Sequence, residues 1–187
     1  MLDEKDCCLV VIDVQGKLAE LMHDRENLFK NLCILIQAFR ILEIPVLWCQ
    51  QVPAALGPTV PEIAELLVGL EPINKSSFSC CGCEEFNDKL YELNKKRFDN
   101  AHRRQIMLCG IEAHVCVYQT AVDLLERDYE VEAISDAVSS RTLANKDIGL
   151  DKIAAEGAQI TSVETCLFEI LKTAEHPHFR QIAKLIR

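Results

Sequence analysis

Glycine, proline and long apolar runs are all scarce in this sequence. Only seven of its 187 residues are glycine and six are proline, and we find no internal repeat, low-complexity tract or linker. Collagen-like, disordered and two-domain chains are therefore poor fits, and we expect one domain over residues 1–187. The longest apolar stretches, such as residues 7–12, fall far short of the ~20 residues that a membrane helix needs. No membrane partner is expected.

Basic residues are outnumbered by acidic ones. Lys and Arg total 20 against 29 Asp and Glu, which gives a formal net charge of −9 at pH 7. A surface of this sign repels phosphate backbones, so nucleic acid is not an expected partner.

Cysteine, in contrast, is abundant. Most of the ten cysteines lie inside apolar runs, where a thiol packs as a small hydrophobic group, and no basic-then-apolar leader precedes them. We therefore expect a reducing, cytoplasmic location and free thiols instead of a disulfide scaffold. The cysteines are Cys7, Cys8, Cys33, Cys49, Cys80, Cys81, Cys83, Cys109, Cys116 and Cys166.

Short β-branched apolar runs alternate with longer segments in which apolar residues recur at helical spacing. This alternation is typical of repeated βαβ units around a parallel sheet. The predicted strands cover residues 8–12, 45–49, 71–74, 105–109, 130–135 and 159–161. The predicted helices cover residues 25–42, a short stretch from 61, 84–95, 115–127, 146–156 and segments near the C-terminal end.

Three residues with catalytic chemistry follow predicted strands. Asp13 follows the first strand, Lys75 the third, and Cys116 lies in the turn after the fourth. The carboxyl ends of parallel strands meet at one edge of the sheet, where ligands bind in open α/β folds. Taken singly, each residue has a plainer explanation as a cap, a solvated lysine or a core thiol. Their equivalent positions favour a shared site.

The three groups together indicate acyl transfer to water through a thioester. A thiol with a pKa of about 8.5 is only slightly ionised at neutral pH, so a cysteine nucleophile needs help. A helix N-terminus and Lys75 would both favour the Cys116 thiolate. Asp13 could accept the thiol proton and pass it to a leaving amine, while backbone amides between Gly110 and Cys116 hold the oxyanion.

The same residues carry a family resemblance. The run GIEAHVCV at residues 110–117 resembles the isochorismatase-like cysteine hydrolases, as do residues 11–15, 74–79 and 135–141. The likeness spans nearly the whole chain. It implies a three-layer α/β/α, Rossmann-like fold around a six-stranded, mainly parallel sheet, and assembly into a homo-oligomer.

The resemblance also assigns site residues. It implies a catalytic triad of Asp13, Lys75 and Cys116, and a non-proline cis peptide between Ile111 and Glu112. The backbone amides of Glu112 and Cys116 would then form the oxyanion hole.

Departures from the family pattern narrow the chemistry. Nicotinamidases of this family carry histidines after the second strand that bind a metal, whereas this sequence has no histidine between His23 and His102. We therefore expect no metal and no cofactor. A cysteine nucleophile favours a small-molecule substrate with an amide, imide or ester-like carbonyl, and a hydrolase acting on C–N bonds. Residues 50–60 look more like the subgroup of isochorismatase domain-containing proteins.

Five further residues are candidates for the substrate pocket. Each also has a plainer interpretation as core or turn. They are Gln15, Trp48, Gln50, Phe78 and His114.

Two hypotheses of different classes remain open on the sequence. The first is a cysteine-dependent hydrolase of a small carbonyl compound. The second is a catalytically silent small-molecule-binding or scaffold protein of the same fold, which the missing metal ligands would also suit.

Overall fold

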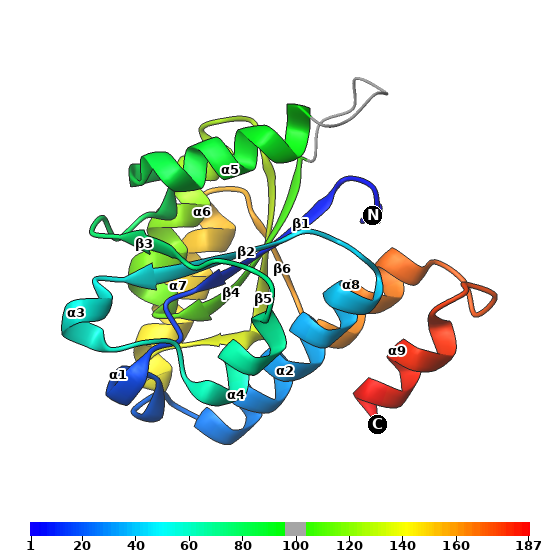
Figure 1. Ribbon diagram of the computed structural model, residues 1–187, viewed down its shortest axis with the longest axis horizontal. Coiled ribbons are helices and arrows are strands. Elements are labelled where there is room, and N and C mark those ends of the chain that lie inside the picture. Colours follow the sequence, from blue (N-terminus) through cyan, green and yellow to red (C-terminus); the bar gives the residue numbers. More distant parts are fainter. Residues whose placement is uncertain (96–103) are drawn as a thin grey trace.

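The computed structural model describes residues 1–95 and 104–187, which form a six-stranded sheet between two layers of helices (Figure 1). The strand order is β3-β2-β1-β4-β5-β6, and each pairing between neighbouring strands is parallel. The strands are β1 (Cys7–Ile12), β2 (Val46–Gln51), β3 (Ile73–Lys75), β4 (Gln105–Ile111), β5 (Glu130–Ser139) and β6 (Gln159–Thr161). The predicted three-layer α/β/α fold is confirmed, with a wholly parallel sheet.

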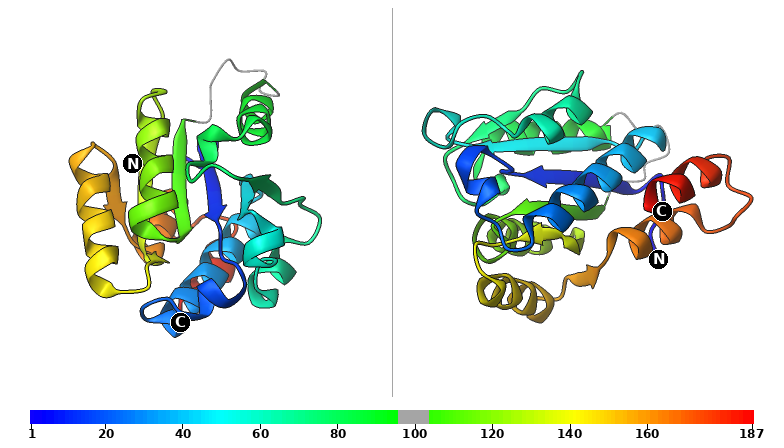
Figure 2. Two further views of the ribbon diagram at one scale, coloured as in Figure 1. Left: turned by 90° about the vertical axis from the view of Figure 1, so that its left-hand side faces the viewer. Right: turned by 90° about the horizontal axis from the view of Figure 1, so that it is seen from below.

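Helices cover both faces of this sheet (Figure 2). They are α1 (Gly16–Glu20), α2 (Arg25–Ile41), α3 (Pro53–Leu56), α4 (Pro61–Ala64), α5 (Glu84–Lys95), α6 (Tyr118–Leu125), α7 (Leu143–Ala155), α8 (Val163–Leu171) and α9 (Phe179–Ile186). Shorter turns are η1 (Glu65–Leu67), η2 (Cys80–Gly82) and the π-helical turn η3 (Ala113–Val117). In the described residues, no helix is both long and apolar enough to cross a membrane.

Two hydrophobic cores lie on opposite faces of the sheet. Along β1, Leu9 and Val11 join the core that contains residues of α2, α4, α8 and α9, whereas Val10 and Ile12 join the core with α5, α6 and α7. A central strand buried on both faces needs apolar residues at every position, which explains the unbroken run of residues 7–12. All ten cysteines are free thiols, and eight of them are buried.

The centre of the sheet brings the ends of β1 and β4 close together. Gly110 has φ +112°, and a Cβ atom there would lie 2.0 Å from the carbonyl oxygen of Ile12. Only glycine fits this approach, because a side chain would meet fixed backbone. The residues that follow β1 and β4 therefore emerge side by side, at the position where the strand order reverses.

A second glycine sets the position of η3. Gly149 on α7 packs against this turn, and a Cβ atom there would lie 2.6 Å from the backbone carbon of Ala113. Alanine ordinarily stabilises a helix by about 1 kcal/mol over glycine. We expect Gly149→Ala instead to lower the free energy of unfolding by about 1–3 kcal/mol, because η3 must move. Urea denaturation measures this change. Asp147→Ala, at an exposed position of α7, should stay within about 0.5 kcal/mol of wild type.

Candidate active site

Asp13 and Lys75 form a buried ion pair at the carboxyl end of the sheet. Lys75 Nζ lies 2.7 Å from Asp13 Oδ2, and the two side chains are 0% and 3% exposed, respectively. Asp13 has φ +54°, a left-handed conformation that aspartate tolerates better than most residues and that turns the chain out of β1. Taking both charges out of water is costly, so removing either partner should be strongly destabilising.

The ammonium of Lys75 has four acceptors for its three protons. Besides Asp13, it donates to Gln51 Oε1 at 2.7 Å and to the carbonyl oxygens of Phe78 at 3.0 Å and Ser77 at 3.2 Å. Burial is the largest single effect and lowers the pKa of Lys75, but the charge and hydrogen bond of Asp13 together with the neighbouring Cys80 and Cys116 raise this pKa above its ordinary value. Lys75 is thus a fixed cation that holds Asp13.

Cys116 lies in η3, the turn that leads from β4 into α6. Its thiol is buried beside Asp13, with the residue 7% exposed. Burial and the negative charge of Asp13 raise the pKa of Cys116 to about 12, although Lys75 acts in the opposite direction. The expectation that the helix N-terminus and Lys75 favour a Cys116 thiolate is therefore wrong, because the pKa of this thiol is raised and not lowered. The sequence predicts that Asp13 and Lys75 lie near the thiol, but it does not reveal how deeply the thiol is buried.

The carboxylate of Asp13 lies beside this thiol. Asp13 Oδ1 is buried and has no partner of good hydrogen-bond geometry among the described residues. Burial raises the pKa of Asp13, while Lys75 and the Cys116 thiol both lower it. Lys75 holds the Asp13 carboxylate, and the Cys116 thiol lies beside it. In this arrangement Asp13 can receive the thiol proton.

A small pocket opens above these groups. Its volume is about 110 Å³. Around Asp13 and Cys116 its wall consists of Leu18, Gln51, Leu56, Phe78, Ile111, Glu112 and Val115. An apolar cavity of about 150 Å³ holds benzene, so this pocket suits the reacting end of a small molecule.

Both residues expected to supply oxyanion donors border the pocket. Glu112 and Cys116 line it, and the peptide bond between Ile111 and Glu112 is cis. The Glu112 carboxylate is held by Arg141, whose backbone N–H and Nε donate to Glu112 Oε2 at 2.9 and 3.2 Å. The side chain of Glu112 is thereby drawn toward Arg141.

Of the five predicted pocket residues, Phe78 lines the pocket. The other four are engaged elsewhere. Gln15 is fully buried, donates to the carbonyl oxygens of Gln51 and Gly57, and accepts from the Gln51 amide, which fixes the loops around the site. Trp48 and Gln50 both donate to Thr59 Oγ1, at 2.8 and 2.9 Å. The fourth, His114, pairs through Nδ1 with Ser140 Oγ at 3.0 Å.

Gln51 is a site residue that the sequence analysis missed. It ends β2, lies opposite Lys75 in the register and contacts the ammonium. Asp13 and Lys75 are selected because they lie at the carboxyl ends of parallel strands. The same rule applies to the end of β2, so the pair Gln50 and Gln51 could have been identified there. Alternation of side chains along the strand directs Gln50 to Thr59 and Gln51 to the site.

Metal ligands are not gathered here. Within residues 1–95 and 104–187, no group of three or more His, Cys, Asp or Glu side chains is placed to hold a metal ion.

Comparison with known proteins gives consistent matches. The family model described as "Isochorismatase domain" matches residues 7–165. Isochorismatase domain-containing protein 2 of Danio rerio is 37% identical over 185 residues, which cover 99% of this chain and 89% of the zebrafish protein. The secreted isochorismatase effector Isc1 of Phytophthora sojae is 36% identical over 183 residues, covering 96% and 83%.

A solved structure is similarly close. The structure described as the MAR1 ribonuclease of Caenorhabditis elegans is 34% identical, with a TM-score of 0.88, covering 99% of this chain and 91% of that one. The fold and the strand-end site define a Rossmann-like α/β protein of the hydrolase type. The chain belongs to the isochorismatase domain family.

Proposed function

We propose that this protein is a cysteine-dependent hydrolase of a small amide, imide or ester-like carbonyl compound, and that residues 1–187 act as one catalytic domain. The observation that carries the proposal is the placement of the Cys116 thiol beside the Asp13 carboxylate, which Lys75 holds at 2.7 Å, with Cys116 and Asp13 both lining a pocket of about 110 Å³. C–N bonds are the preferred targets, because Asp13 can return a proton to a leaving amine.

In the first half of the reaction, Asp13 takes the proton of Cys116 as Sγ attacks the carbonyl carbon. A C–S bond forms and the carbonyl oxygen becomes an oxyanion, which the backbone amides of Glu112 and Cys116 would stabilise. Collapse breaks the bond to the leaving group, which receives the proton from Asp13. Because the thiol pKa is about 12, proton transfer and attack occur together, without a resting thiolate.

In the second half, water hydrolyses the thioester. Asp13 accepts a proton from the water as it attacks, and the departing Cys116 sulfur recovers that proton. Lys75 stays charged throughout and keeps the carboxylate in place. No cofactor enters either half.

A specific observation favours the second candidate function, a catalytically silent binding protein. The thiol pKa of about 12 is that of a structural cysteine, and burial raises the pKa of Cys81 to about 12 as well. Against this interpretation, Asp13 Oδ1 is buried without a hydrogen-bond partner of good geometry among the described residues, a cost that a purely structural site has no reason to retain.

The name ribonuclease, printed for the C. elegans relative, does not extend well to this chain. A pocket of about 110 Å³ is too small to enclose a nucleotide, and the net charge of −9 opposes a polyanion. We propose a small-molecule substrate. The exposed side chain of Phe78, which lines the pocket, and other exposed apolar side chains such as Leu21 support association of copies into a homo-oligomer.

A trapped intermediate tests the proposal. We expect small esters and amides, mixed with the enzyme and quenched in acid, to leave an acyl group on Cys116 that peptide mapping by mass spectrometry locates. The rate should fall as pH drops through the pKa of Asp13, which lies above its ordinary value because of burial. It should also fall at alkaline pH only as Lys75 loses its proton. Turnover with no adduct on Cys116, or turnover of RNA alone, would refute the proposal.

A further inference from the structure

A second and larger cavity lies at the opposite end of β2 from Gln51. Its volume is about 510 Å³, and among the described residues it shares no lining residue with the pocket at Cys116. We call it the edge groove. Its apolar lining is Val46, Leu47, Trp48, Leu70, Ile73 and Leu93.

Within the described part of the chain, the first residues of β2, at the base of the edge groove, have no neighbouring strand on the β3 side. β3 pairs with β2 only over Cys49–Gln51, whereas β1 pairs with β2 from Val46 onward. The carbonyl oxygens of Pro45 and Cys49 accept from β1, so the backbone groups of Val46 and the N–H of Trp48 point the other way. They face the groove.

The sequence explains why the third strand stops short. Pro72 immediately precedes β3 and has no N–H to extend the ladder. Gly69 has φ +87°, a left-handed conformation that allows the chain to turn just before β3. As a result, side chains from both faces of the sheet, Val46 on one and Leu47 on the other, reach the same cavity.

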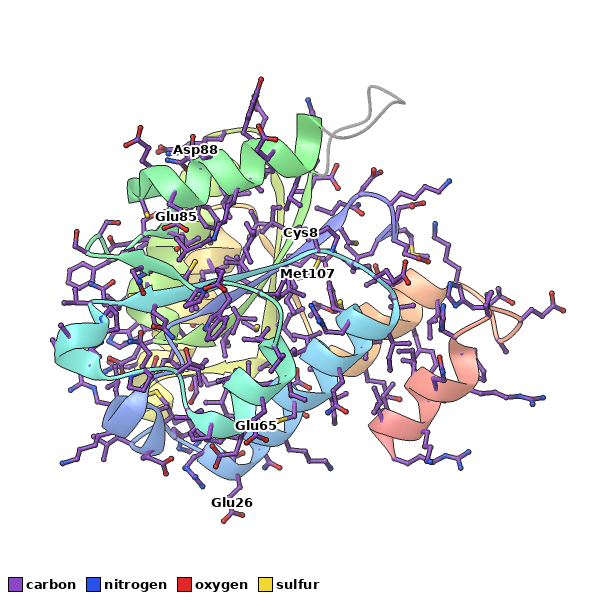
Figure 3. All side chains as sticks on the ribbon, viewed as in Figure 1. Cys8, Glu26, Glu65, Glu85, Asp88 and Met107 are labelled. Carbon is purple, nitrogen blue, oxygen red and sulfur yellow. The ribbon has the colours of Figure 1, made fainter. Side chains whose placement is uncertain are left out.

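The rim of the edge groove is acidic. The acidic residues Glu71 and Asp88 border it, and Figure 3 shows Asp88 on α5 beside Glu85. Among the described lining residues, the basic Lys89 is already paired: its Nζ lies 2.9 Å from Glu85 Oε1 and also donates to the carbonyl oxygen of Glu71 at 3.4 Å. The rim therefore favours a cationic ligand.

We propose that the edge groove binds an extended peptide segment of a partner protein by strand addition to β2, with apolar side chains flanked by lysine or arginine. The backbone groups of Val46 and Trp48 supply the pairing, the apolar lining receives alternate side chains, and the acidic rim selects the flanking cations. A further cavity of about 350 Å³, which shares Pro45, Val46 and Leu70, continues the path along the strand. The proposal is independent of the hydrolytic function.

Trp48 provides a reporter inside the site, because it is the single tryptophan of the sequence. We expect a blocked peptide of sequence KVIVK to change Trp48 fluorescence saturably. A charge-reversed peptide, EVIVE, and a KVIVK peptide N-methylated at both valines should each bind at least tenfold more weakly. The first comparison tests the charged rim and the second tests strand pairing.

Charge-reversal variants locate the binding. Glu71→Lys combined with Asp88→Lys should weaken binding of KVIVK at least tenfold and leave turnover unchanged. The matched control, Glu26→Lys combined with Glu65→Lys, makes the same change in net charge at exposed sites away from α5 and should alter binding less than twofold (Figure 3).

Three results of the peptide experiments would overturn the proposal, and a fourth comes from varying the protein concentration. They are no saturable change in Trp48 emission, equal binding of the N-methylated peptide, and equal weakening by the two charge-reversal pairs. The second result would identify a site for small amphipathic cations. Occlusion of the groove by self-association, seen as peptide binding that weakens as protein concentration rises, would also count against it.

Discussion

Cys116→Ala is expected to reduce kcat for a small ester or amide substrate by about 10³–10⁶-fold, because it removes the proposed nucleophile, which Asp13 would activate. The free energy of unfolding should change by no more than about 1–2 kcal/mol, since one sulfur is lost from a buried position. Steady-state kinetics and urea denaturation on the same preparations measure the two effects.

A matched variant distinguishes the nucleophile from thiols in general. Cys33→Ala removes a half-buried thiol on α2 that does not line the pocket, and its kcat should equal that of wild type. If Cys116→Ala retains comparable activity, covalent catalysis is excluded. Absence of turnover in the wild-type protein itself would instead favour the silent binding protein.

Lys75→Met is the substitution with the largest expected effect on stability. We expect the free energy of unfolding at pH 7 to fall by about 3–5 kcal/mol, because Asp13 is left as a buried charge without its partner. Lys89→Met is the matched control. It removes a partly exposed ion pair with Glu85 and should cost no more than about 1 kcal/mol.

The loss in Lys75→Met should depend on pH in a defined direction. Burial already raises the pKa of Asp13, and removing Lys75 removes the charge that opposes this shift. A carboxyl whose pKa is higher in the folded than in the unfolded state binds protons more tightly when folded. The variant should therefore regain stability as pH falls through the folded-state pKa of Asp13. Urea midpoints that do not change with pH, or an Asp13→Asn/Lys75→Met double variant no more stable than Lys75→Met, would contradict the assigned pairing.

The sequence predicts the strands well because parallel strands buried on both faces leave a strong signal. All six predicted runs overlap observed strands, and the predicted helix 84–95 coincides with α5. The short helices are predicted less well than the strands. α1 and α3 contain five and four residues, and their positions depend on packing around Gln15 instead of on periodicity.

The site is predictable only as far as strand ends identify it. Asp13, Lys75 and Cys116 follow from that rule, and the structure brings the first two into an ion pair and the third beside them. The rule does not say which of two adjacent glutamines faces the site, since that depends on side-chain alternation in a strand whose register is set by distant residues. Nor does it give the pKa of Cys116, which depends on burial.

The shared acceptors of Lys75 have a consequence for substrate selection. The ammonium that holds Asp13 also fastens the carbonyl oxygen of Phe78, and the Phe78 side chain forms part of the pocket wall. Lys75 thus fixes both Asp13, the proposed proton carrier, and Phe78, an aromatic residue of the pocket wall. A bulky acyl group that displaced Phe78 would weaken the contact between Lys75 and Asp13. A substrate that does not fit the pocket would therefore reduce the ability of Asp13 to act as the base.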